Sequence, residues 1–151
     1  MVLQFTDGRP FTTGVCSYWD QLSREGSETP RIIINIEIEG LQTQAAVDTG
    51  GVYLVCDPEM SDLLDLNPST SLGVDTLNIR GSKYQGSLQR IMVKMSAEEG
   101  ESLDLEVTAF IPRLVPGQEW RLPSFLGLQG CLEFLRIAID PSVNAFHFGP
   151  L

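Results

Sequence analysis

Residues 32–51 of this chain read I-I-I-N-I-E-I-E-G-L-Q-T-Q-A-A-V-D-T-G-G. Isoleucine recurs at every second position in the first part of this stretch, and β-branched residues with a period of two are typical of a β-strand. Gly40 then supplies a turn, and residues 41–48 predict a second strand that runs back beside the first. Asp48 therefore stands at the end of a hairpin arm, where the chain leaves its sheet.

The remainder of the chain continues this pattern of short strands. Strands are predicted at residues 52–56, 74–80, 87–95, 103–111, 137–140 and 143–148, and short helices at residues 59–66 and 131–136. Glycines bracket a polar turn at residues 81–86, which predicts a hairpin with a mobile tip. Many short strands with one short C-terminal helix predict an all-β fold, a small closed barrel.

Length and composition indicate a single globular domain. The chain has 151 residues, of which 42% are hydrophobic and 20% charged, so it can bury a core. Residues 1–30 are polar and rich in turn formers, and we expect them to form an N-terminal extension packed on a domain that spans residues 31–151. No apolar run approaches a membrane span, and the first residues lack the basic leader and apolar core of a signal peptide. We therefore expect a cytoplasmic protein that does not interact with membranes.

The net charge argues against one class of partner, and the cysteines argue against two kinds of structural site. Twenty acidic residues against ten basic ones give a net charge of −10, which repels phosphate backbones, so we expect no nucleic acid partner. Attraction of basic substrates and plain solubility both account for this charge. Cys16, Cys56 and Cys131 lie far apart and form no C-x-x-C pair, which argues against a disulfide framework and against a zinc site.

Two motifs, together with the hairpins between them, resemble a known family. Ala46-Val47-Asp48-Thr49-Gly50 resembles the active-site strand and loop of the retropepsin-like aspartic proteases. The hairpin at residues 81–86 resembles their flap, and Phe125-Leu126-Gly127 with the segment 131–136 resembles their hydrophobic-hydrophobic-glycine motif and C-terminal helix. Chance alone would supply Asp-Thr-Gly in roughly one chain of this length in thirty. The likeness covers residues 31–149 in the family's order, and its last part is similar to the C-terminal signature of predicted bacterial aspartyl proteases.

The resemblance implies an aspartic endopeptidase that acts as a homodimer on a peptide or protein substrate, with no cofactor and no metal. Two carboxylates about 3 Å apart share one proton, so that one activates water while the other protonates the scissile carbonyl oxygen. This chain has a single Asp-Thr-Gly, and each subunit would bring its Asp48 to the two-fold axis. Thr49 would hydrogen-bond the partner loop, and Gly50 would permit the sharp turn.

The resemblance also assigns the residues around the substrate. Flap residues would close over an extended peptide, which pairs with backbone on both sides. The expected flap and cleft residues are Gly51, Gly81, Ser82, Tyr84, Gln85 and Gly86. Phe125, Leu126 and Gly127 would pack behind the catalytic loop as support, and the final strand at residues 143–148 would pair across the dimer interface.

Gly51 departs from the family pattern, in which Ala, Ser or Thr usually follows the triplet. A hydroxyl there can hydrogen-bond the outer oxygen of the catalytic carboxylate and favour its ionised form. Without that hydroxyl, we expect the dyad to keep its proton to higher pH, which would move the optimum toward neutrality. A loosened loop with weak or lost activity is the other interpretation of Gly51.

Two functional classes remain open at this point. One is the active homodimeric protease, and the other is a catalytically silent protease-like module that binds peptides or partner proteins, in which Asp48 is an ordinary turn residue. His147, the single histidine, alternates with two phenylalanines on a predicted strand, which favours a surface or interface position over a catalytic base. No nucleophile elbow, dinucleotide fingerprint or P-loop occurs.

Overall fold

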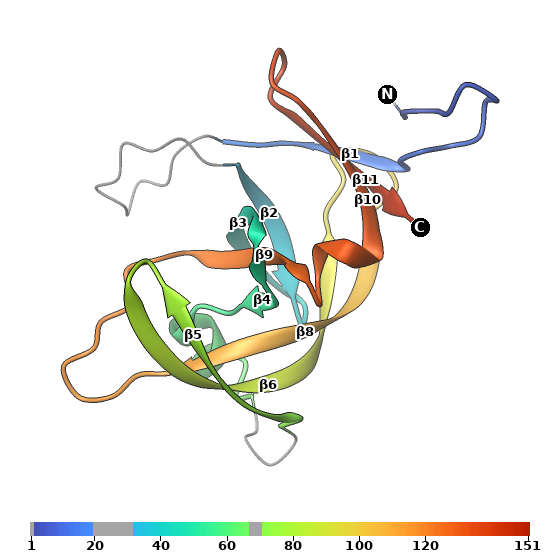
Figure 1. The fold of residues 1–151 in the computed structure, drawn as a ribbon. Coiled ribbons are helices and arrows are strands. Elements are labelled where there is room, and N and C mark those ends of the chain that lie inside the picture. The colour runs from blue at the N-terminus through green and yellow to red at the C-terminus, as the bar shows by residue number, and fades with distance from the viewer. Residues whose placement is uncertain (1, 20–31, 67–70) are drawn as a thin grey trace.

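The structure is a computed structural model that describes residues 2–19, 32–66 and 71–151 (Figure 1). The described part consists almost entirely of β-strands in two sheets. The all-β prediction is therefore confirmed, although the larger sheet closes only approximately into a barrel. The expected boundary between residues 30 and 31 lies outside the described residues.

The larger sheet has the strand order β2-β3-β9-β4-β8-β6-β5 within the described residues. The end of β6 also pairs with β2, which brings the sheet back toward its own first strands, and Figure 1 shows β6 curving around the sheet. The strands are β2 (Ile33–Ile38), β3 (Leu41–Val52), β4 (Leu54–Val55), β5 (Gly73–Ile79), β6 (Ser82–Met95), β8 (Leu103–Arg113) and β9 (Ser124–Gln129).

The hairpin predicted at residues 32–48 is confirmed as the antiparallel pair β2–β3. Its register runs from Ile33 opposite Ala46 to Ile38 opposite Leu41. Glu39 and Gly40 connect the two strands, and both have positive φ angles, 48° and 85°. A two-residue hairpin turn of the primed type needs positive φ at both positions, which explains why glycine occupies the second one.

The smaller sheet has the order β10-β11-β1-β7 and lies at the opposite side of the molecule from the β5–β6 hairpin (Figure 1). Its strand β11 pairs with β10 on one side and with β1 on the other, so the expectation that the final strand pairs across a dimer interface is wrong. The expected N-terminal extension contributes β1 to this sheet. The strands are β1 (Gly14–Ser17), β7 (Glu99–Gly100), β10 (Leu135–Asp140) and β11 (Ala145–Pro150).

The helix predicted at residues 131–136 is reduced to a 3-10 turn, η2 (Leu132–Phe134). Cys131 at its start makes no side-chain capping hydrogen bond, and from Leu135 onward the chain pairs along its whole length with β11. Pairing in the sheet therefore overrides the weak helical pattern. The other helix, α1 (Pro58–Leu63), begins after Asp57, whose carboxylate accepts a hydrogen bond from Glu59 N at 2.8 Å.

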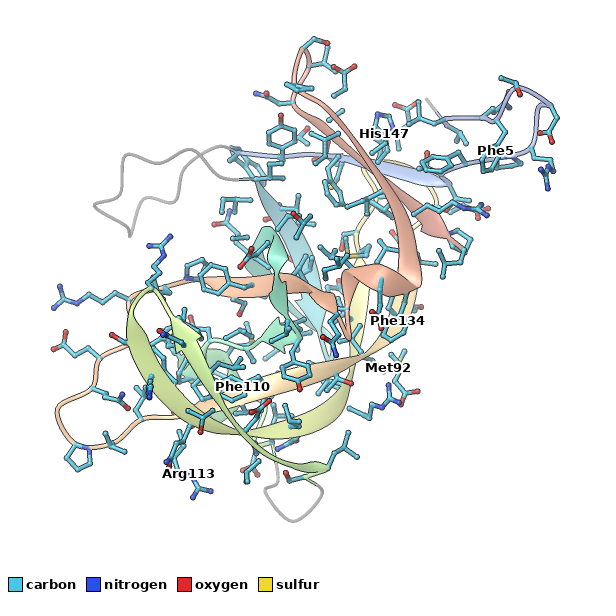
Figure 2. All side chains as sticks on the ribbon, in the orientation of Figure 1. Phe5, Met92, Phe110, Arg113, Phe134 and His147 are labelled. Atoms are coloured by element: carbon cyan, nitrogen blue, oxygen red, sulfur yellow. The ribbon has the colours of Figure 1, made fainter. Side chains whose placement is uncertain are left out.

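The core is divided into two apolar clusters. The larger one lies between the two sheets and includes the fully buried Phe146 and Phe148 of β11. The smaller one lies inside the seven-stranded sheet, around Phe110, near the β5–β6 hairpin (Figure 2). In the described part of the chain, no helix is long and apolar enough to cross a membrane.

Candidate active site

Asp48 lies where the regular pairing of β3 with β9 ends. These two strands are parallel, and their register places Asp48 opposite Gly127. The register then shifts and resumes with Val52 opposite Gln129. Residues 49–51 are therefore displaced from the paired ladder and form a bulge within β3, called the Asp48 loop or catalytic loop below.

The loop backbone fixes the carboxylate of Asp48. The backbone N–H of Gly50 donates a hydrogen bond to Oδ1 of Asp48 at 3.2 Å. Gly51 lies against the other oxygen, because a Cβ built on Gly51 would be only 2.8 Å from Oδ2. Any larger residue at position 51 would force the carboxylate to move, so the departure at Gly51 and the position of the exposed Asp48 side chain are coupled.

The segment Phe125-Leu126-Gly127 forms the part of β9 that lies between β3 and β4. Leu126 contributes to the larger core cluster and Phe125 to the smaller one, so β9 supports the loop from both sides. The backbone N–H of Gly127 donates to the carbonyl of Tyr53 at 2.8 Å. A Cβ on Gly127 would collide with that carbonyl oxygen and lie 2.7 Å from the carbonyl carbon of Val52, which explains the need for glycine.

A cleft of about 290 Å³ opens beside Asp48 and extends to the β5–β6 hairpin. Asp48 is the only acidic residue among the described residues that line this cleft. Its walls are mixed, with apolar side chains and glycines beside the polar Asn78 and Arg80. The remaining lining residues are Gly50, Gly51, Val52, Val55, Leu77, Asn78, Ile79, Arg80, Phe125 and Gly127.

The hairpin that faces Asp48 has a tight turn at Arg80 and Gly81. Both residues have positive φ angles, 51° and 81°, as a two-residue turn of the primed type requires. Within the described residues, β5 pairs with β6 alone, so the other edge of β5 carries unpaired backbone groups. Such an edge can accept an extended chain as an additional strand.

The structure brings together part of the expected site. Gly50, Gly51, Phe125 and Gly127 line the cleft with Asp48, whereas Thr49 is exposed and lies outside its lining. Leu126 is fully buried beneath it.

The expected flap residues lie elsewhere in this single subunit. Gly81 and Ser82 are exposed at the hairpin turn, outside the lining of the cleft. Tyr84 is buried, with its ring 5.1 Å from that of Trp120. Gln85 and Gly86 line a second hollow, on a different part of the hairpin.

Sequence reasoning missed the first arm of the hairpin, residues 77–80, which lines the cleft. The interpretation rested on the glycines that bracket residues 81–86 and assigned the cleft to the second arm. The signal that could have identified the first arm is the pair Arg80-Gly81, because a two-residue turn there makes the strand predicted at residues 74–80 end at Ile79 and form the opposite arm. Val52 and Val55 belong to the segment 52–56, which we expect from the sequence in the pocket walls, and both line the cleft.

The other reactive side chains in the described part of the chain, three thiols and one imidazole, do not line the cleft. Burial raises the pKa of the thiols of Cys16, Cys56 and Cys131 to about 12, and nearby Glu98 and Asp57 add to the rise at the first two. These thiols are therefore protonated at neutral pH and are poor nucleophiles. His147 is buried in β11, at the end of the molecule opposite the cleft (Figure 2). The described residues contain no group of three or more potential metal ligands.

Comparison with known proteins yields similarity in structure alone. The sequence matches no protein-family model, and a search of curated proteins gives no match. A retropepsin-like aspartic protease from Rickettsia conorii matches with a TM-score of 0.54 over 92% of this chain and 94% of its own, at 14% identity. Basic 7S globulin from soybean matches with a TM-score of 0.55 over 93% of this chain and 50% of its own, at 13% identity.

These matches show that the fold is that of the retropepsin-like aspartic proteases. At 13–14% identity they show the fold and no more than the fold. One of the two proteins is named as a protease and the other as a globulin, so the fold alone does not decide between catalysis and binding. The chain spans about half the length of the soybean protein.

Proposed function

We propose that this chain is one subunit of a homodimeric aspartic endopeptidase in which Asp48 supplies half of the catalytic dyad. The observation that carries the proposal is the position of Asp48: its carboxylate is held in a cleft that it shares with residues of the edge strand β5. A peptide that extends β5 as a further strand would pass directly over this carboxylate.

The reaction requires two carboxyl groups in opposite protonation states. The ionised Asp48 of one subunit takes a proton from a water molecule, whose oxygen bonds to the scissile carbonyl carbon, while the neutral Asp48 of the partner donates its proton to the carbonyl oxygen. As the C–N bond then breaks, the Asp48 that took the water proton gives it to the leaving nitrogen, and the partner's Asp48 takes back a proton from a hydroxyl of the intermediate, which becomes a carboxylic acid. Two like charges in close proximity cannot both ionise comfortably, and this repulsion maintains the mixed state.

A second copy is needed because the described lining of the cleft offers no second acid. In the smaller sheet, β11 is paired on both sides, whereas β10 and β7 are edges within the described residues. These edges lie at the end of the molecule opposite the cleft, so in this proposal the subunits meet on the face that presents Asp48, where the two carboxylates must come together.

The cleft supports a peptide with an apolar side chain beside the scissile bond. Val52, Val55 and Phe125 form one wall, and Leu77 and Ile79 of β5 form the other. A volume of about 290 Å³ lies at the lower end of the range for ligand sites, which suits one or two side chains per subunit. Burial of these groups would contribute affinity, and pairing with β5 would fix the direction of the chain.

Cleavage of a peptide library by wild type and by Asp48→Ala tests the proposal, with and without pepstatin as a transition-state inhibitor. We expect cleavage by wild type, inhibition by pepstatin, and a loss of at least about 10³-fold in kcat/KM in the variant. Cleavage that survives Asp48→Ala would exclude this site. A chain that stays monomeric at all concentrations would contradict the shared dyad.

The pH–rate profile tests the expectation for Gly51. The site offers no side-chain hydroxyl at position 51 to favour the ionised carboxylate, so we expect an optimum nearer neutrality. A Gly51→Ser variant should lower that optimum, whereas a wild-type profile that peaks below about pH 4 would contradict the expectation.

The second candidate is a silent protease-like module that binds peptides. The orientation of the Asp48 carboxylate favours it, because Oδ1 accepts from Gly50 N–H and Oδ2 occupies the space that a Cβ on Gly51 would need, so the carboxylate lies back over its own loop. Peptide binding that is independent of Asp48, together with no cleavage by a demonstrated dimer, would support this candidate over the protease.

A further inference from the structure

The β5–β6 hairpin has a fixed base and a projecting part. Strand β6 pairs with β8 from Met95 as far as Gln85, whereas residues 82–84 pair with β5 alone within the described residues. The last level held by β8 is Gln85, which faces Thr76 of β5, and the neighbouring Asp75 faces Gly86 of β6. Gly86 is packed closely there, because a Cβ on it would lie 2.6 Å from the ring of Phe110. Asp75 therefore marks the level at which the hairpin leaves the body of the protein.

Contacts to the body differ between the two arms above this level. The β6 arm contacts the loop before β9: the side-chain amide of Gln118 donates to the carbonyl of Lys83 at 3.0 Å, and Tyr84 packs on Trp120. The β5 arm, which faces Asp48, has no neighbouring strand on its outer edge among the described residues. Its side-chain hydrogen bond to the body is made by Asp75, which accepts from the hydroxyl of Tyr53 at 3.2 Å.

Tyr53 belongs to the same backbone segment as the catalytic loop. Its own N–H donates to the carbonyl of Gln129 at 2.6 Å, and its carbonyl accepts from Gly127, the residue opposite Asp48. Its φ angle is 61°, a left-handed conformation that costs a bulky aromatic residue free energy. Such a residue persists where the surrounding structure imposes its conformation, and strain of this kind is concentrated at functional sites.

The acceptor is held as firmly as the donor. Oδ1 of Asp75 accepts from the backbone N–H of Thr76 at 2.7 Å, which leaves Oδ2 directed toward the Tyr53 hydroxyl. The Tyr53 ring lies against Gly130, where a Cβ would come within 3.3 Å of Cδ1. Leu77, two residues beyond Asp75, packs on the same apolar cluster as Tyr53 and lines the cleft.

We propose that Tyr53 is a positioning residue that fastens the base of the hairpin to the catalytic loop through Asp75 and so sets the position of residues 77–80 over Asp48. The hydrogen bond joins the two walls of the cleft, so the hairpin and the loop move together. The effect on catalysis rests on the proposed protease function, whereas the mechanical link does not.

Hydrogen exchange at backbone amides of full-length protein tests the link without any catalytic readout. In Tyr53→Phe, which removes the hydroxyl alone, we expect amides of residues 77–84 to exchange about three- to tenfold faster, because local opening of the hairpin loses one hydrogen bond to a carboxylate. Amides of β2 and β11 should be unchanged. Unchanged exchange at residues 77–84 in a folded variant would overturn the proposal.

Matched variants separate the link from the general effect of the substitution. Tyr18→Phe makes the same chemical change in the larger core cluster, and it should leave exchange in the hairpin unaltered. Asp75→Leu should reproduce the effect of Tyr53→Phe. Asp75→Asn should retain slow exchange, since the tyrosine hydroxyl can donate to or accept from an amide. An Asp75→Asn variant that exchanges as fast as Asp75→Leu would contradict this role for the hydrogen bond.

Steady-state kinetics then tests the consequence for the site. With peptides cleaved by wild type, Tyr53→Phe should raise KM about three- to tenfold with a smaller change in kcat, because the hairpin binds the extended chain and Asp48 is untouched. Equal KM values in the two proteins would contradict the positioning role. If Asp48 proves dispensable for cleavage, the proposed function fails while the exchange experiment still decides whether the link exists.

Discussion

The two ends of this molecule are built in different ways. At the four-stranded sheet, large aromatic side chains of β11 are fully buried, and Arg136 of β10 lies over the ring of Phe5, 5.2 Å from its centroid. At the cleft, the chain uses glycine at positions 50, 51 and 127 and leaves Asp48 exposed. The end with the four-stranded sheet stabilises the fold through buried side chains. The end with the cleft is close-packed through its backbone and leaves the Asp48 carboxylate exposed.

The largest difference in stability is expected when one side chain is truncated at each of the two ends. Phe146→Ala should lower the free energy of unfolding by about 3–5 kcal/mol, because it removes a fully buried ring from the larger cluster. Asp48→Ala should change it by less than about 0.5 kcal/mol, since that side chain is exposed. Urea unfolding of both variants measures the two values, and equal losses would remove the proposed division between the two ends.

A smaller effect is expected from adding one methyl group beside the loop at residues 49–51. Gly127→Ala should cost about 1–3 kcal/mol of stability, because its Cβ would collide with the rigid backbone of residues 51–53. Gly50→Ala is the matched control, since its Cβ would lie 3.6 Å from Asp48 Oδ1, an ordinary contact. Thermal unfolding of both proteins should rank them in this order, and the reverse ranking would show that the loop is not held by β9.

The packing of the N-terminal segment on the smaller sheet predicts a smaller loss. Phe5 contacts Arg136 through its ring face and Phe11 edge-on, with ring centroids 5.3 Å apart. Phe5→Ala should cost about 1 kcal/mol, and Phe5→Leu should recover the part that is due to apolar burial. Urea unfolding measures the difference, and a loss near that of Phe146→Ala would place this segment in the core.

The smallest effect concerns pH and the turn between β10 and β11. Hydrogen bonds from the hydroxyl and backbone N–H of Ser142, at 2.6 and 2.9 Å, lower the pKa of Asp140 below its usual 3.8. Because the folded-state pKa is lowered, this contribution to stability is present above that value and is lost as the pH falls through the folded pKa. Thermal midpoints between about pH 6 and pH 3 should therefore fall slightly more in wild type than in Asp140→Asn. An equal fall of the thermal midpoint in wild type and in Asp140→Asn would contradict this expectation.

The sequence predicted those features that depend on local periodicity and turn chemistry. The alternating isoleucines and Gly40 define the β2–β3 hairpin, and its end places Asp48 at the boundary of a sheet. The segment at residues 131–136 shows the limit of this reasoning, because a weak helical pattern gave way to pairing with β11 along residues 135–140. For the same reason only part of the cleft was predicted, because the strands that pack around a hairpin decide which of its two arms faces the cleft.

Asp48, its glycine-rich loop and the all-β architecture were thus accessible from the amino-acid sequence alone, because strand periodicity and the backbone freedom of glycine are local properties. The tertiary structure decided which residues share a cleft with Asp48, that the Asp48 carboxylate fills the space a Cβ on Gly51 would need, and that Tyr53 reaches Asp75. These contacts join segments that pair through the register of parallel and antiparallel strands, and no local pattern specifies that register.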